Sequence, residues 1–98
     1  MRLPSDACHS PDFSSAVWNG VYYTFTPTQA AMFRELWNAF ESGLPEVHAA
    51  ALIEAAGSRS QRNALGPLFS RNSAWKTLVV RCKRRGYYRL NLDAPKEP

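Results

Sequence analysis

The chain has no acidic residue between Glu54 and Asp93. Nine basic residues occupy the same stretch: Arg59, Arg62, Arg71, Lys76, Arg81, Lys83, Arg84, Arg85 and Arg89. Residues 1–58 hold two basic residues against six acidic ones, so the overall charge of +4 conceals two halves of opposite sign. A basic face on a folded scaffold indicates a polyanionic partner, of which nucleic acid is the commonest.

Other features are missing as well. No apolar run approaches the ~18–20 residues of a membrane span, and residues 1–11 lack the apolar core of a secretory signal. Two cysteines, Cys8 and Cys82, provide no disulfide framework, so a cytoplasmic protein is expected. With 98 residues, of which 45% are apolar and 12% aromatic, the chain suits one domain with a real core.

Signatures of catalysis and metal binding are lacking too. The sequence contains no phosphate-binding loop, nucleophile elbow or GxGxxG motif, and its acidic residues are scattered singly. Cys8, His9, His48 and Cys82 lack the close paired spacing of a structural zinc site. We therefore expect a protein that is not an enzyme, with no catalytic residues, no cofactor and no metal.

Turn and capping signals predict how the chain is organised. Residues 1–14 are expected to form a flexible arm, residues 15–92 one domain and residues 93–98 a disordered tail. Asn19–Gly20 lies between β-branched and aromatic residues, which predicts a hairpin with a type I′ turn. Thr26, Pro27 and Gln29 predict a capped helix that ends at Gly43.

Two more helices and a second hairpin are predicted to follow. The helices cover Glu46–Ala56 and Ser60 to about Asn72, with a kink or break at Gly66–Pro67. Strands are predicted over residues 75–82 and 87–92, joined by the cationic turn Lys83–Gly86. The expected fold class is α+β, in the order β-β-α-α-α-β-β.

Packing expectations follow for the aromatic residues. Trp18, Trp37 and Trp75 are predicted to lie in the core, because aromatic side chains dominate the cores of small domains. Tyr87 and Tyr88 are adjacent on a predicted strand, so they should point to opposite faces, one buried and one exposed.

Three motifs resemble those of a known family. VWNGVYYTF (residues 17–25) resembles the short hairpin before helix 1 of the OmpR/PhoB-type effector domain, and TPTQAAMF (residues 26–33) resembles its L-T-x-x-E-x-x-L-L opening. RRGYYRL (residues 84–90) is similar to its R-G-x-G-Y-R-L wing. The chain is also similar to small bacterial winged-helix proteins. The resemblance implies a winged helix-turn-helix with an N-terminal hairpin and a C-terminal basic wing hairpin.

This fold implies where nucleic acid would bind. The third helix would enter the major groove of double-stranded DNA, and the wing at residues 83–86 would contact the backbone or the minor groove. Arg and Asn side chains can read base edges, while Lys and Arg neutralise phosphates. The candidate contacts are Arg59, Ser60, Arg62, Asn63, Ser70 and Arg71 on the recognition helix, Lys83, Arg84 and Arg85 on the wing, and Lys76 and Arg81 as flanking phosphate contacts.

The expected function is therefore that of a small transcriptional regulator, of a bacterial type, that binds DNA. Two alternatives stay open. One is a winged-helix module that docks on another protein in a larger assembly, which the acidic residues of the first two helices favour. The other is RNA binding through the same basic face. The sequence leaves the target site and a homodimer open.

Overall fold

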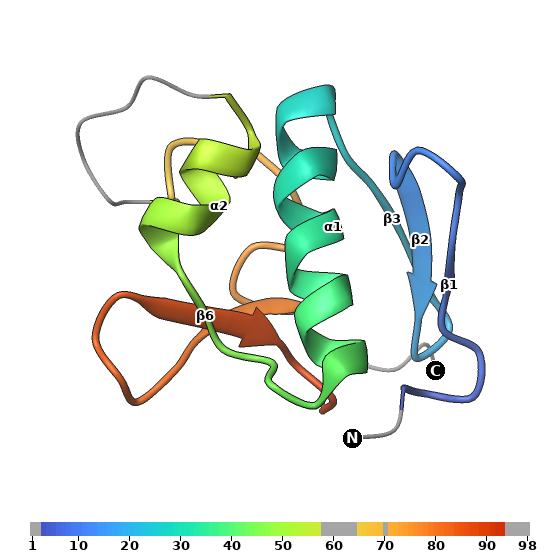
Figure 1. The fold of residues 1–98 in the computed structure, drawn as a ribbon. Helices are drawn as coiled ribbons and strands as arrows, with labels where there is room; N and C mark the ends of the chain where they lie inside the picture. The colour runs from blue at the N-terminus through green and yellow to red at the C-terminus, as the bar shows by residue number, and fades with distance from the viewer. Residues whose placement is uncertain (1–2, 58–64, 70, 94–98) are drawn as a thin grey trace.

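The computed structural model describes residues 3–57, 65–69 and 71–93, and within them the fold is α+β, with two helices and two three-stranded antiparallel sheets (Figure 1). The elements are β1 (Cys8–His9), β2 (Ser15–Trp18), β3 (Val21–Thr24), α1 (Pro27–Ser42), β4 (Val47–His48), α2 (Ala49–Ala55), β5 (Val79–Arg81) and β6 (Tyr87–Leu90). Neither described helix has the length and apolar character that crossing a membrane requires. The predicted α+β class is confirmed.

The first sheet has the strand order β1–β2–β3 and is built on the predicted hairpin. Trp18 pairs with Val21, and the two turn residues Asn19 and Gly20 have φ values of 54° and 80°. Both turn residues therefore adopt the positive φ that a type I′ turn requires, which confirms the prediction. The Asp6 carboxylate accepts hydrogen bonds from the backbone N–H groups of both.

The segment before this hairpin is not a free arm, which corrects the prediction for residues 1–14. Cys8–His9 pairs with β2, and the His9 ring stacks on Phe13 with the ring centroids 3.7 Å apart. Hydrogen bonds from Ser14 and Ser10 lower the pKa of Asp12 to about 2. The described part of this segment is held to the fold by strand pairing, ring stacking and a hydrogen-bonded turn.

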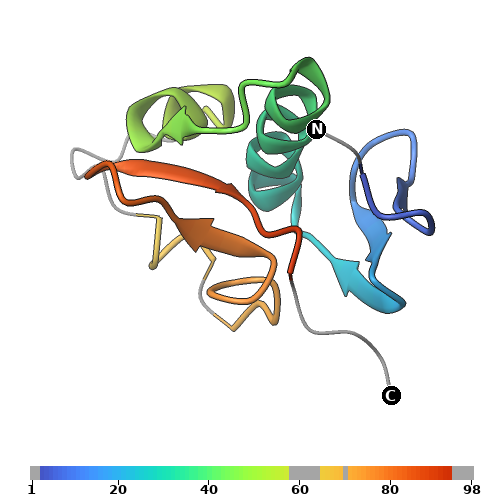
Figure 2. The ribbon, with the colours of Figure 1, turned by 90° about the horizontal axis from the view of Figure 1, so that it is seen from below.

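Helix α1 begins and ends as predicted. Thr26 and Gln29 form the capping box, Pro27 occupies the first turn, and Gly43 ends the helix in the left-handed conformation. Figures 1 and 2 show α1 between the β1–β2–β3 sheet on one side and α2 with the β4–β6–β5 sheet on the other. Its buried side chains are Gln29, Ala30, Met32, Phe33, Leu36, Trp37 and Phe40.

The second predicted helix starts later than expected. Val47–His48 forms β4, which pairs with β6, and α2 covers only Ala49–Ala55. His48 caps α2, because its Nδ1 atom accepts the N–H of Ala50 at 3.1 Å. Helical spacing alone could not reveal this strand, since its partner β6 lies far along the chain.

The third predicted helix is absent from its described part. Residues 66–69 form a turn, and Arg71 has a φ of 64°, which an α-helix does not allow. Gly66 and Pro67 explain this result, because a proline removes a helical hydrogen bond and clashes with the preceding turn. Leu65 and Phe69 still lie in the core, fully buried.

The strand predicted over residues 75–82 is shorter than expected. Residues 76–78 form turns, Lys76 has a φ of 68°, and β5 covers only Val79–Arg81. β6 likewise covers residues 87–90 rather than 87–92. The cationic turn between the two strands lies where it was predicted, with Gly86 at a φ of 84°.

The core is dominated by aromatic rings from α1 and β2. Trp18 meets Trp37 and Phe40 edge to face, with centroid distances of 5.8 and 5.4 Å. Trp18 and Trp37 are buried as predicted, whereas Trp75 is half-buried and stacks on Phe69. This packing leaves one buried polar residue among those described, Gln29.

Gln29 ties α1 to the turns that replace the third helix. Its Nε2 donates to the Leu68 carbonyl oxygen at 2.9 Å, and its Oε1 accepts from Asn72 Nδ2 at 2.8 Å and from the Thr26 N–H at 3.0 Å. Asn72 Nδ2 also donates to the Thr24 carbonyl oxygen at 2.9 Å. Gln29 and Asn72 together therefore join β3 and α1 to the turns around Leu68 and Asn72.

Replacing Gln29 with Met should lower the free energy of unfolding by about 2 kcal/mol, because the Leu68 carbonyl and the Thr26 N–H lose the Gln29 side chain as a partner and Asn72 Nδ2 loses one of its two acceptors. Thr26→Ala removes only the helix cap and should cost about 1 kcal/mol. Urea denaturation of both variants and of the wild-type chain measures the two losses. Equal losses of unfolding free energy in the two variants would show that Gln29 stabilises the fold only through the helix cap.

Candidate nucleic-acid interface

The β5–β6 hairpin carries the predicted wing. Arg81 pairs with Tyr88, and beyond that pair the Cys82 N–H donates to the Tyr87 carbonyl oxygen at 2.9 Å. The Tyr87 N–H donates to the Arg84 carbonyl oxygen at 3.2 Å and closes the turn. Tyr88 and Leu90 are buried, while Tyr87 and Arg89 are half-buried on the opposite face of the sheet. The two tyrosines therefore alternate as predicted, although Tyr87 is half-buried rather than exposed.

The turn is fastened to the start of α2. The Ala49 N–H donates to the Gly86 carbonyl oxygen at 2.8 Å, and a Cβ atom on Gly86 would lie 3.1 Å from Nε2 of His48. Gly86 therefore satisfies two requirements at once, a left-handed backbone and close contact with a ring. In Figure 1 the hairpin turn lies beside the beginning of α2.

The β5–β6 hairpin carries five cationic side chains. Arg81, Lys83, Arg84 and Arg85 are exposed, and Arg89 is half-buried. Four of them, with Glu46 and Cys82, line one pocket of about 560 Å³, which we call the basic pocket; the four are Arg81, Lys83, Arg84 and Arg89. The structure thus brings the wing residues Lys83 and Arg84 together with the flanking residue Arg81.

Aromatic contacts fix the position of Arg84. Its guanidinium carbon lies 4.2 Å from the centroid of the Tyr87 ring, in cation–π geometry. Tyr87 meets the His48 ring edge to face, with the centroids 5.1 Å apart. The guanidinium is therefore held against the sheet before any ligand binds, and less of its conformational entropy is lost on binding.

Glu46 and Arg89 act on the same thiol. Burial and the Glu46 carboxylate raise the pKa of Cys82, while Arg89 lowers it. If the β4–β6 register of Val47 with Tyr88 continues by one residue, Glu46 lies opposite Arg89. Since the net effect is a raised pKa, Cys82 is mainly the neutral thiol at pH 7.

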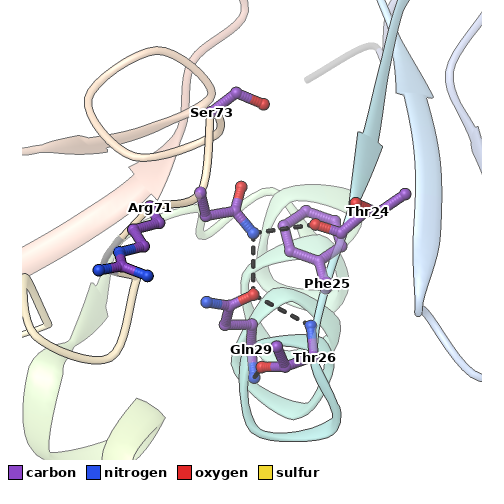
Figure 3. A pocket seen from close by; sticks show the side chains of 7 residues that line it. Thr24, Phe25, Thr26, Gln29, Arg71 and Ser73 are labelled. Atoms are coloured by element: carbon purple, nitrogen blue, oxygen red, sulfur yellow. Dashed lines mark hydrogen bonds between the residues drawn. The ribbon is translucent and has the colours of Figure 1, made fainter.

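Arg71 and Lys76 lie apart from the basic pocket. Arg71 lines a second pocket, of about 480 Å³, with Thr24, Phe25, Thr26, Gln29, Asn72 and Ser73. Figure 3 shows the Arg71 side chain extending along one side of this pocket, next to the hydrogen bonds that Gln29 receives. Lys76 is exposed in the turn before β5, where its N–H donates to the Val79 carbonyl oxygen.

Arg71 was predicted on a recognition helix, and this prediction is wrong, because the residue occupies a left-handed turn at the N-terminal end of α1. The other recognition-helix candidates, Arg59, Ser60, Arg62, Asn63 and Ser70, lie outside the described residues. Of the described candidates, Arg81, Lys83 and Arg84 lie together at the basic pocket, and Arg85 is exposed in the same turn.

Sequence reasoning missed three members of this site. Glu46 was assigned to a helix, Arg89 was counted only for its charge, and Tyr87 was not linked to Arg84. The alternation of Tyr87, Tyr88 and Arg89 could have placed Tyr87 and Arg89 on one face. Nothing in the sequence pattern pairs Glu46 with the hairpin.

Comparisons with protein-family models, with curated proteins and with solved structures found no match. Among residues 3–57, 65–69 and 71–93, no group of three or more His, Cys, Asp or Glu side chains is placed to hold a metal ion.

Gly86→Ala should destabilise the chain more than Gly43→Ala. Both glycines have left-handed φ values, 84° and 85°, but only Gly86 has a neighbour, His48, within 4 Å of the added Cβ. We expect losses of about 2 and about 1 kcal/mol, respectively, in the free energy of unfolding, measured by urea denaturation. Equal losses would contradict a close contact between the turn and His48.

Glu46→Gln should lower the pKa of Cys82, because the carboxylate that disfavours the thiolate is removed. The pH dependence of Cys82 alkylation in a Cys8→Ser background measures this pKa. The alkylation rate at neutral pH should rise. Glu35→Gln, an equal change of charge on the exposed side of α1, is the control and should leave the pH profile unchanged.

Proposed function

We propose that the chain is a small DNA-binding protein of the winged-helix type, a regulator that contacts the phosphate backbone of a duplex through its β5–β6 hairpin. The observation that carries the proposal is the gathering of four basic side chains around one pocket, with the exposed Arg85 in the same turn. The hairpin itself contains no acidic residue that would offset this charge. The carboxylate that lines the pocket belongs to Glu46, which directly precedes β4.

The chemistry of the hairpin suits a phosphate backbone. Lysine and arginine side chains neutralise phosphates and release condensed counterions, which supplies affinity for any sequence. Arg84 also has a preset orientation, since its guanidinium rests on Tyr87. A guanidinium fork matches the oxygens of a phosphate and can donate two hydrogen bonds to it.

The order of elements supports a winged helix in outline. A hairpin precedes α1, and α2 is followed by a basic hairpin that pairs with the strand before α2. Sequence selectivity would come from the residues between α2 and Leu65. Arg59, Ser60, Arg62 and Asn63 are its candidates, and their role stays a prediction from the sequence.

Duplex DNA binding should depend steeply on salt. Five phosphate contacts predict a slope of about −4.5 in a plot of log affinity against log salt concentration. The double change Lys83→Ala and Arg85→Ala should reduce the magnitude of this slope by about 2, because two contacts are lost. Fluorescence anisotropy at several salt concentrations measures the slopes.

Arg34→Ala is the matched control, because Arg34 is an exposed cation on α1 outside the basic pocket. It should leave the slope near the wild-type value. Competition between duplex DNA, duplex RNA and single strands distinguishes the RNA alternative, since side chains cannot read the narrow major groove of A-form RNA. Absence of binding at low salt would reject nucleic acid and leave the protein-docking alternative.

A further inference from the structure

The basic pocket contains a feature that a general affinity for phosphates does not need. Four cations line it together with a single carboxylate, that of Glu46. An exposed basic patch attracts polyanions without any concavity. A concave site, in contrast, lets several side chains converge on one bound group.

The lining comes from two segments that are held in register. Arg81, Cys82, Lys83, Arg84 and Arg89 belong to the β5–β6 hairpin, and Glu46 directly precedes β4. The β4–β6 pairing of Val47 with Tyr88 and the bond from Ala49 N–H to the Gly86 carbonyl oxygen hold the two segments together. The pocket is thus formed by ordered backbone, and Arg84 is fixed further by Tyr87.

Glu46, Arg89 and Cys82 all line this pocket. The charges of Glu46 and Arg89 act in opposite directions on the Cys82 thiol. A carboxylate among cations occupies the position that suits an incoming anion, and it repels that anion.

We propose that the basic pocket is a binding site for one phosphate group, held by Arg81, Lys83 and Arg84, and that the Glu46 carboxylate weakens this binding. The identity of the natural ligand rests on the proposed function, which makes a nucleic acid the source of the phosphate. That source is either an internal phosphodiester or a 5′-terminal phosphate. Glu46 is the specificity-determining residue. Its carboxylate repels any anion that enters the pocket, so only a ligand with enough negative charge to gain more from the three cations than it loses to Glu46 will bind.

Cys82 provides a direct readout, because its thiol lines the pocket. In a Cys8→Ser background, inorganic phosphate should slow the alkylation of Cys82, and sodium chloride at equal ionic strength should not. Arg81→Gln should weaken this protection about tenfold in phosphate concentration, whereas Arg34→Gln should preserve it. Equal effects of phosphate and chloride on the wild-type chain would overturn the proposal.

Glu46→Gln tests the role of the carboxylate and keeps a side chain that can still hydrogen-bond to Cys82. It should lower the phosphate concentration for half-protection about fivefold, the effect expected for one unit charge near a protein surface. Glu35→Gln makes the same change in net charge away from the pocket. If both variants bind phosphate equally well, Glu46 has no specific effect and this part of the proposal is wrong.

The source of the phosphate is decided with oligonucleotides. A duplex with 5′-phosphates that protects Cys82 better than the same duplex without them identifies a terminal phosphate, and equal protection identifies the backbone. Protection by inorganic phosphate without any binding of nucleic acid would reject the proposed function and keep the pocket. Salt-dependent duplex binding that leaves Cys82 unprotected would reject the pocket and keep the function.

Discussion

The burial of α1 on both of its sides is the constraint on which the rest of the fold depends. On one side Trp18 of β2 packs edge to face against Trp37 and Phe40. On the other side α1 contacts α2 and the strands β4 and β6. Since Tyr88 and Leu90 are buried in this core, the alternate residues Tyr87 and Arg89 must face away from it. The aromatic core therefore makes Arg89 face away from it, whereas the exposed Arg81 pairs with Tyr88 and lies on the same side of the sheet as that buried ring.

Elements with a local cause could be predicted from the sequence. The α1 boundaries follow from Thr26, Gln29 and Gly43, and the first hairpin follows from Asn19–Gly20, because caps and tight turns depend on a few adjacent residues. The cationic turn before Gly86 was predicted for the same reason. Each of these signals is contained within a few residues of the element that it defines.

Elements with a distant cause could not be predicted. β4 exists because Val47 meets Tyr88, and the turns around Leu68 and Asn72 are tied to α1 by Gln29. At the site, the charges of Lys83 and Arg84 were expected, but the approach of Glu46 and the stacking of Arg84 on Tyr87 depend on the sheet register. The spacing of apolar residues predicts the type of each element, but it does not show which distant residues will contact that element.

The pairing of β4 with β6 has a consequence for how the chain folds. The first hairpin and α1 are closed by contacts between near neighbours, so they can form early. The β4–β6–β5 sheet joins Val47–His48 to Tyr87–Tyr88, and the long intervening chain must be closed into a loop first. The pairing of β4 with the basic hairpin is therefore among the last contacts to form. During synthesis, which runs from the N-terminus, Glu46 cannot meet the hairpin cations until the hairpin itself has emerged.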